Sequence, residues 1–314
     1  MRVAFCGSGT FAIPSLKAIL RSDHQAVLVV TQPPRPAGRG GKMRPTPIAL
    51  LSREEGLEPL ASADVNGDDA VSAVRAARPD AICVVEFGQL VRQAFRDAAS
   101  VDAFNLHASL LPELRGAAPV NWALVRGYER TGVTTFSLTD RLDDGPIYLQ
   151  EAMRIEPDDT AESLRLRLAD TGAETVIRTL DLLRDGGAVA TAQDESGATQ
   201  APKLKKSDGR ICWADSAGAI RNRIRGTFPW PGAQTVFQRK DRSAVPVILG
   251  SAAVAEGQVD GRAGRIDEDL FVATGCGRLG ILTIKPAGKR MMDWRDFVNG
   301  YRVGPGDGFG TEGN

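Results

Sequence analysis

The sequence is poor in cysteine and histidine, with four cysteines and two histidines among 314 residues. No CxxC pair and no mixed cysteine–histidine cluster occurs among the four positions, which are Cys6, Cys83, Cys212 and Cys276. Structural zinc needs closely spaced ligands, and a chain of this length can bury a core without disulfides. We therefore expect neither a metal site nor a disulfide framework.

Long apolar runs are also missing. The longest, Ala26–Val30 and Ala81–Val85, have the length of buried strands and are far too short to cross a bilayer. The first five residues, MRVAF, already have a strand-like pattern, which predicts neither a signal nor a transit peptide. These patterns favour a cytoplasmic protein with no membrane partner.

A net charge is absent as well, because 39 basic residues balance 39 acidic residues. The balance hides an asymmetry between the two parts of the chain. Residues 203–314 carry 18 Lys and Arg against 12 Asp and Glu, whereas the remainder carries 21 against 27. A basic C-terminal part predicts a polyanionic partner, although ordinary surface variation explains the same numbers.

Strand-like and helix-like segments alternate through the first half of the chain. Strands are expected at Arg2–Gly7, Gln25–Gln32, Glu58–Ala61, Asp80–Val85, Ala103–His107, Thr135–Leu138 and Ile147–Ile155. Helices are expected at Ile13–Arg21, Pro47–Glu55, Asp68–Ala77 and Ala161–Arg184. Such alternation predicts an α/β domain with a Rossmann-like, mostly parallel sheet and helices on both faces.

The pattern changes after a small, polar segment, Ala188–Gln200, which is typical of a linker. Short β-like runs separated by Gly, Asp and Arg then predict a smaller, barrel-like β domain. We therefore expect domains at residues 1–187 and 206–314, joined by a linker at 188–205. The glycine-rich tail Gly304–Asn314 is expected to be loose.

A glycine-containing turn follows the first expected strand. Residues Gly7–Ala12 read GSGTFA and fit the GxGxxA variant of the dinucleotide-binding fingerprint. That fingerprint also needs an acidic residue near the end of the second strand, and Ala26–Lys42 contains no Asp or Glu. We interpret the glycines as a tight turn able to accept an anion at the helix N-terminus. A nicotinamide-dependent oxidoreductase is disfavoured.

The expected strand at Ala103–His107 ends in a polar pair, Asn105 and His107. Residues two apart on a strand point to the same face, so Leu106 enters the opposite layer. An imidazole can move a proton near neutral pH, and an amide N–H can stabilise an oxyanion. For His107 alone, a hydrogen-bonded core histidine is the simpler interpretation. The other histidine, His24, follows a helix and is expected at the surface.

A carboxylate that could orient this imidazole lies 36 residues later. The segment Leu142–Ile147 reads LDDGPI and places Asp143 after another strand-like segment. A carboxylate there could hold the imidazole and favour its protonated form. Acids in Gly-Pro turns also occur for purely structural reasons. The combination of Asn105, His107 and Asp143 is what indicates a catalytic site.

Four elements in this order resemble the folate-dependent formyltransferases. That family is marked by an Asn-x-His strand, an SLLP segment and a later Asp within an LDxG turn. This chain has the first and last in Asn105/His107 and Asp143, the second in Ser109–Pro112, and RGAAP at Arg115–Pro119. Segments APKL, PWPG and AGKRM in the second half match as well, so the resemblance covers essentially the whole chain.

The resemblance implies that a formyl group moves from 10-formyltetrahydrofolate to the methionine α-amine of initiator methionyl-tRNA, without a metal. Asn105 would donate to the developing oxyanion, while His107 and Asp143 would manage protons. Folate would lie beside Ser109, Leu110, Leu111 and Pro112. The chain departs from the family pattern at Gly7–Thr10, Glu86–Gly88, Asp144 and Ala287, outside the Asn/His/Asp set.

A basic loop resembles the insertion of family members that act on tRNA. It has no acid, and its glycines and prolines suit a mobile arm; its basic residues are Arg35, Arg39, Lys42 and Arg44. A solvated surface loop is the alternative. In the family, the second domain is an OB-like barrel with a basic face that holds tRNA, which fits the charge of +6. The expected contacts at its start are Lys203, Lys205 and Lys206.

Other functions fit parts of the sequence. A sugar-nucleotide N-formyltransferase shares the catalytic set but needs no basic loop. A glycinamide ribonucleotide transformylase is normally a single short domain, and a non-catalytic RNA-binding protein has no use for Asn105, His107 and Asp143. We expect the enzyme to act as a monomer.

Overall fold

The computed structural model describes residues 1–37, 41–240, 244–257 and 262–310. Contacts divide the chain into two compact units, each built from more than one stretch of sequence. The first unit comprises Met1–Pro119, Arg130–Arg154 and Arg165–Pro202. The second comprises Val120–Glu129, Ile155–Leu164 and Lys203–Asn314.

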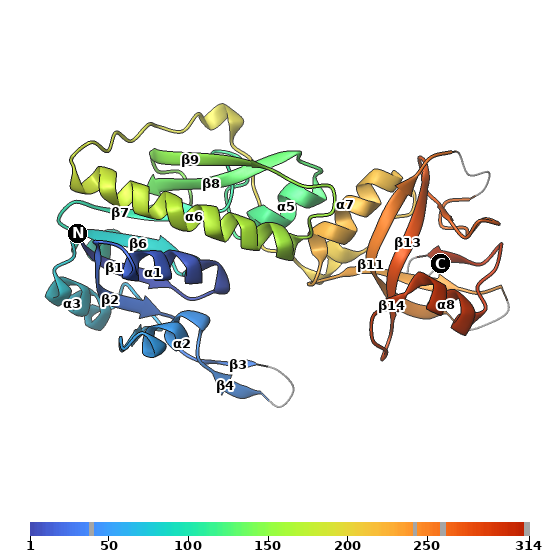
Figure 1. Cartoon of the computed structure of the whole chain (residues 1–314), viewed down its shortest axis with the longest axis horizontal. Coiled ribbons are helices and arrows are strands. Elements are labelled where there is room, and N and C mark those ends of the chain that lie inside the picture. Colours follow the sequence, from blue (N-terminus) through green and yellow to red (C-terminus); the bar gives the residue numbers. More distant parts are fainter. Residues whose placement is uncertain (38–40, 241–243, 258–261, 311–314) are drawn as a thin grey trace. The chain divides into compact units, whose positions relative to one another are not determined.

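A seven-stranded sheet forms the centre of the first unit (Figure 1). Its first five strands are mutually parallel; β8 then pairs antiparallel with both of its neighbours, so that β9 runs in the direction of the first five. In spatial order these are β5 (Leu60–Ala61), β2 (Gln25–Thr31), β1 (Arg2–Gly7), β6 (Ala81–Val85), β7 (Asp102–His107), β8 (Arg130–Ser137) and β9 (Ile147–Arg154). All five residues of β6 are buried, as the continuous apolar run of a two-sided parallel strand requires.

Helices cover both faces of this sheet. On one face, α3 (Asp68–Ala77) and α4 (Gln93–Arg96) pack onto the even-numbered side chains of β1 and β6. On the other face, α6 (Ala161–Arg184) brings Gly172 against Leu106 of β7. The remaining helices that precede β5 are η1 (Thr10–Ala12), α1 (Ile13–Leu20) and α2 (Pro47–Glu54). This confirms the Rossmann-like, mostly parallel α/β fold.

The strand order reverses between β1 and β6. The chain moves outward from β1 to β2 and β5, then returns to β6 and continues on the other side to β7. In such sheets the crevice beyond the carboxyl ends of the strands at the reversal is where ligands bind. Here those ends are Gly7 and Val85, and the end of the next strand is His107.

The second unit contains an almost closed antiparallel barrel. Its strands run in the order β12 (Val272–Ala273), β13 (Arg278–Pro286), β11 (Val245–Ala255), β10 (Ala233–Gln238) and β15 (Gly308–Gly310), with β14 (Met292–Asp293) on β13. Two single bridges at Arg265 and Ile266 link the end strands β15 and β12. Phe237, Phe297 and Phe309 pack in its core, beside helices α7 (Ala217–Thr227) and α8 (Trp294–Tyr301). This is the expected small β-barrel domain.

Two local expectations were wrong. Gly308–Gly310 of the expected loose tail pairs with β10 as its second antiparallel partner, which extends the barrel; residues 311–314 lie outside the described part. The sequence leaves open whether the basic loop is ordered; in the structure it contains a two-stranded hairpin, β3 (Arg35–Ala37) and β4 (Lys42–Arg44). His24 is buried, with its ring nitrogens 3.2 Å from the N-terminal amine and 3.3 Å from a carboxylate oxygen of Asp181.

The turn after β8 has no room for a side chain at Gly145. A Cβ there would overlap the carbonyl oxygen of Ser137, which is backbone and cannot rotate away. We expect Gly145→Ala to lower the free energy of unfolding by about 1–3 kcal/mol, the usual cost of overpacking. Urea unfolding measures the change. Gly300→Ala is the matched control, because a Cβ at this helical position meets nothing within 4 Å. Equal midpoints for Gly145→Ala and the parent protein would refute the packing argument.

Candidate active site

Asn105 and His107 lie on the same face of β7, near its carboxyl end. Asn105 is in register with Val84 and Phe136, and His107 with Thr134 of β8. His107 is buried, whereas Asn105 is only half-buried. Among the residues that the structure describes, none forms a hydrogen bond with the Asn105 side-chain amide. Its N–H groups are therefore available to a bound molecule.

The orientation of the His107 ring is set by a backbone carbonyl. Nε2 lies 2.9 Å from the carbonyl oxygen of Leu114. Because a carbonyl only accepts hydrogen bonds, Nε2 carries a proton in this arrangement. In the neutral ring Nδ1 is then the unprotonated nitrogen. Nδ1 is consequently the atom of His107 that can take up a proton.

Asp143 provides a carboxylate on the Nδ1 side of this ring. Its Oδ2 lies 3.7 Å from His107 Nδ1 and accepts a hydrogen bond of 2.8 Å from the Gly116 N–H. Both side chains are more than nine-tenths buried. At 3.7 Å the contact is an ion pair when the ring is protonated, rather than a short hydrogen bond. The pair has the geometry needed to accept a proton and release it again.

The segment Ser109–Pro112 follows β7 and is held by a buried hydroxyl. Thr134 Oγ1 donates to the carbonyl of Ser109 at 2.6 Å and accepts from the Leu111 N–H at 3.1 Å. The Gln150 side-chain amide donates to Thr134 Oγ1 at 3.0 Å and to the Leu111 carbonyl at 2.8 Å. Leu110 and Pro112 stay half-buried, while Ser109 and Leu111 are buried. Two strands thus fix the backbone of this segment.

The glycine-containing turn after β1 holds an anion that belongs to the protein. Oε2 of Glu86 accepts a hydrogen bond of 2.9 Å from the Phe11 N–H at the start of η1, and Oε1 pairs with Arg165 of α6. A Cβ at Gly9 would overlap this carboxylate. The turn can therefore be glycine-rich without binding a dinucleotide, because Glu86 occupies the helix N-terminus.

Arg96 joins two loops of the first unit. Its guanidinium donates to the carbonyl of Val91 at 2.8 Å and to that of Thr139 at 2.9 Å, and it pairs with Asp140 at 2.9 Å. The loop after β6 and the turn that carries Asp143 are thereby fixed to each other. Each exposes a large apolar side chain, Leu90 in the first and Leu142 in the second. Such surface suits a flat, partly apolar ligand.

The basic residues predicted to contact RNA lie in two places. Arg35, Lys42 and Arg44 are exposed on the hairpin β3/β4, in the first unit, and Arg35 is in register with Arg44. Arg39 lies outside the described residues. In the second unit, exposed side chains occur at Lys203, Lys205 and Lys206.

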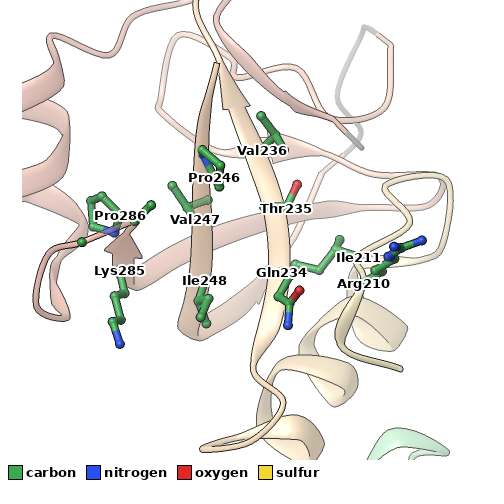
Figure 2. A pocket seen from close by; sticks show the side chains of 12 residues that line it. Arg210, Ile211, Gln234, Thr235, Val236, Pro246, Val247, Ile248, Lys285 and Pro286 are labelled. Carbon is green, nitrogen blue, oxygen red and sulfur yellow. The ribbon is translucent and has the colours of Figure 1, made fainter. Parts of the chain in front are cut away.

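A separate groove lies on the barrel of the second unit (Figure 2). It has a volume of about 500 Å³ and apolar walls that include Pro246 and Ile248, with Arg210 and Lys285 as its charged residues. Among the described residues, no carboxylate and no imidazole lines it. The candidate active site lies instead in the first unit, where the His107 imidazole meets the Asp143 carboxylate.

Two kinds of feature are absent from the described residues. No cluster of three or more His, Cys, Asp or Glu side chains is placed to hold a metal ion. No helix in this part of the chain is long and apolar enough to span a bilayer.

Sequence reasoning missed the residues that hold the Ser109–Pro112 segment and the turn of Asp143. Thr134 and Gln150 read as ordinary strand residues, and Gln193 reads as part of a polar linker. Their importance comes from hydrogen bonds to backbone groups distant in sequence. A single sequence does not reveal such contacts, so it gives no signal that distinguishes these residues from others.

Both parts of the chain match known sequence families. Residues 1–180 match the family described as formyl transferase, and residues 203–302 match the formyl transferase C-terminal domain. The methionyl-tRNA formyltransferase of Geobacter sulfurreducens is 38% identical over 314 residues, which cover 100% of this chain and 98% of the relative. That of Koribacter versatilis is 41% identical over 313 residues, covering 99% of each chain.

A solved structure with a similar fold has a lower sequence identity. The structure of HypX from Aquifex aeolicus in complex with tetrahydrofolic acid has a TM-score of 0.61 and 16% identity. The similarity covers 97% of this chain and 48% of HypX. At that identity the comparison supports the fold alone.

Thr131 and Thr134, two of the three buried threonines of β8, differ in their hydrogen bonds, and this difference is testable. Thr134 Oγ1 has three partners, whereas Thr131 Oγ1 is buried with no hydrogen-bond partner among the described residues. Thr134→Val leaves the Ser109 carbonyl and the Leu111 N–H without this partner. We expect it to lower the free energy of unfolding by about 1–3 kcal/mol. Thr131→Val should cost nothing or stabilise. Denaturant unfolding measures the free energy of unfolding of both variants. Equal decreases in the two variants would count against the assigned hydrogen-bond network.

Proposed function

The chain belongs to the formyl transferase family, and from that membership we propose that it transfers the formyl group of 10-formyltetrahydrofolate to the α-amine of initiator methionyl-tRNA. The relatives that match it over its full length are methionyl-tRNA formyltransferases. The observation that carries the proposal is the contact between His107 and Asp143, with the Asn105 amide on the same face of β7.

Asn105 is proposed to stabilise the negative charge that develops during attack. As the neutral amine of methionine bonds to the formyl carbon, electrons move onto the formyl oxygen. The Asn105 amide can donate to that oxygen without breaking a hydrogen bond within the described protein. A fixed donor of this kind typically contributes about 10²- to 10³-fold in rate.

His107 and Asp143 are proposed to move the protons. The attacking nitrogen must lose one proton, and N10 of the folate must gain one as its bond to the formyl carbon breaks. Nδ1 of His107 can take up the first and return the second, because Nε2 is engaged with Leu114. The Asp143 carboxylate holds the charged ring between the two transfers. The proton lost by the amine equals the proton gained by N10, and all the groups that move it come from one chain.

The folate is proposed to bind beside Ser109, Leu110, Leu111 and Pro112. The pterin would lie between the loops that Arg96 connects, with Leu90 and Leu142 as apolar walls. Backbone groups of these loops could read the polar edge of the pterin, as is usual in sites for flat heterocycles. The Thr134 and Gln150 bonds would keep the Ser109–Pro112 backbone in place for this contact.

The tRNA is proposed to contact the hairpin β3/β4 and the basic start of the second unit. Arg35 and Arg44 are exposed and opposite each other in the hairpin. Like charges in that position repel, so a nearby phosphate would relieve the repulsion. We include Arg39 and Lys42 in this contact, together with Lys203, Lys205 and Lys206.

The rest of the proposal concerns organisation. We propose that residues 1–187 form the catalytic domain, 188–205 the connection and 206–314 the domain that helps hold tRNA. All three catalytic groups come from one chain, so a monomer suffices. The proposed substrate takes part in translation, which makes the cytoplasm the expected compartment.

The direct test supplies purified protein with 10-formyltetrahydrofolate and one of three acceptors. These are methionine-charged initiator tRNA, the same tRNA uncharged, and a sugar nucleotide with a free amine. We expect N-formylmethionyl-tRNA and no product from the other two. Transfer to the sugar amine alone would overturn the acceptor, and transfer to none would overturn formyl transfer itself.

Removing either proton-handling group should nearly abolish turnover. We expect His107→Ala and Asp143→Ala to lower kcat by roughly 10²- to 10⁴-fold. Circular dichroism and urea unfolding check that each variant still folds. Single-turnover formylation of charged tRNA measures the rate, and near-normal rates in a folded variant would remove that residue from the mechanism.

Removing the paired charges of the hairpin should weaken tRNA binding alone. We expect Arg35→Ala/Arg44→Ala to raise the KM for charged tRNA and leave the KM for folate within about twofold. If both contact phosphates, the slope of log K against log salt should fall by roughly 2. The control Arg53→Ala/Arg75→Ala removes two arginines of α2 and α3. The same loss in the control, or an unchanged salt slope in the hairpin variant, would refute phosphate contact.

A further inference from the structure

The stretch predicted to be a linker contains a segment that is bound tightly to the first unit. We name residues 193–201 the strap. The Arg115 N–H donates to the Thr199 carbonyl at 2.8 Å, and the Ala201 N–H donates to the Arg115 carbonyl at 2.7 Å. The Thr199 hydroxyl accepts from the Leu114 N–H at 2.8 Å. The strap therefore pairs with the turn at residues 114–116 almost as a strand does.

Gln193, at the start of the strap, reaches the turn that carries Asp143. Its Nε2 donates to the carbonyl oxygens of Asp143, at 3.0 Å, and Gly145, at 2.8 Å. Its Oε1 accepts from Arg115 Nε at 3.1 Å and Nη2 at 2.7 Å. A guanidinium only donates and a carbonyl only accepts, so these partners fix which way the amide points.

Arg115 is itself held in one orientation. It is only 5% exposed, and its guanidinium makes a two-pronged contact with Glu195 at 3.0 and 2.8 Å. The hydrogen bond with Glu195 raises the pKa of Arg115 above its usual value. Bidentate pairs of this kind specify geometry as well as charge. Gln193 therefore receives its hydrogen bonds from a guanidinium that cannot easily turn away.

The same two turns hold the catalytic pair. The Leu114 carbonyl fixes Nε2 of His107, and the Gly116 N–H donates to Oδ2 of Asp143. The backbone of Asp143 has φ +55°, which is unfavourable for a residue with a side chain and needs support from its surroundings. The two carbonyl bonds from Gln193 supply that support at Asp143 and at Gly145.

We propose that Gln193 is a positioning residue for Asp143, and that Arg115 and Glu195 keep Gln193 in the required orientation. The inference rests on the proposed function, because it assumes that Asp143 acts in formyl transfer. Gln193 does not touch the reacting atoms in this scheme. It acts by keeping the Asp143 carboxylate beside His107 Nδ1.

Gln193→Glu is the sharpest substitution. It keeps the size of the side chain and an acceptor for Arg115, and it replaces the nitrogen that donates to the two carbonyls with an oxygen. Misplacement of a catalytic group by about 1 Å can cost on the order of 10²-fold. We expect the single-turnover rate to fall roughly 10- to 100-fold, with the KM values for folate and for charged tRNA within about twofold of the parent.

The decisive experiment measures this substitution in two backgrounds. If Gln193 acts through Asp143, Gln193→Glu should slow the parent enzyme strongly and the Asp143→Ala enzyme by less than about twofold. Equal fold-losses in both backgrounds would overturn the positioning role. So would a change confined to KM. Ser196→Ala is the matched control in the strap, because within the described part of the chain its hydroxyl donates to Asp194 alone, and it should keep the parent rate.

A second variant and two control results distinguish a failure of this proposal from a failure of the proposed function. If Gln193→Glu does not fold, Glu195→Gln tests the exposed end of the same network and should give a smaller loss of the same kind, in the rate and not in KM. A parent rate in Glu195→Gln would then overturn the proposal. If the parent enzyme transfers no formyl group, or Asp143→Ala keeps the parent rate, the proposed function itself fails.

Discussion

The proposed active site depends on one backbone turn that holds two side chains at once. Within residues 114–116, a carbonyl binds one nitrogen of His107 and an N–H binds one oxygen of Asp143. The histidine comes from a strand and the aspartate from a turn 36 residues later, so neither element alone sets their separation. Because the two groups that the turn supplies both belong to the backbone, the chain itself fixes the distance between them.

Much of this arrangement follows from local sequence. The continuous apolar runs predict β1, β2 and β6, and the period of two places Asn105 and His107 on one face of β7. Resemblance to a family, rather than periodicity, favours Asp143 over Asp144 as the catalytic carboxylate. The structure adds a physical difference, since Asp143 is buried against His107 while Asp144 pairs with Arg141.

Other features could not be predicted because they depend on distant partners. Glu86 is one example, because its carboxylate fills the space that Gly9 leaves open at the start of η1. The two residues lie far apart in sequence, so neither one predicts the other. Gln193 is a similar case, because a polar residue in a polar segment gives no sign that it holds two carbonyls.

The tautomer of His107 gives the most direct test of the central claim. The protein has only two histidines, so ¹⁵N NMR with specifically labelled histidine can be assigned with one His24 variant. Neutral His107 should carry its proton on Nε2, hydrogen-bonded to the Leu114 carbonyl, and leave Nδ1 unprotonated. A neutral ring protonated on Nδ1 would contradict the account, since the atom facing Asp143 could then not accept the proton of the attacking amine.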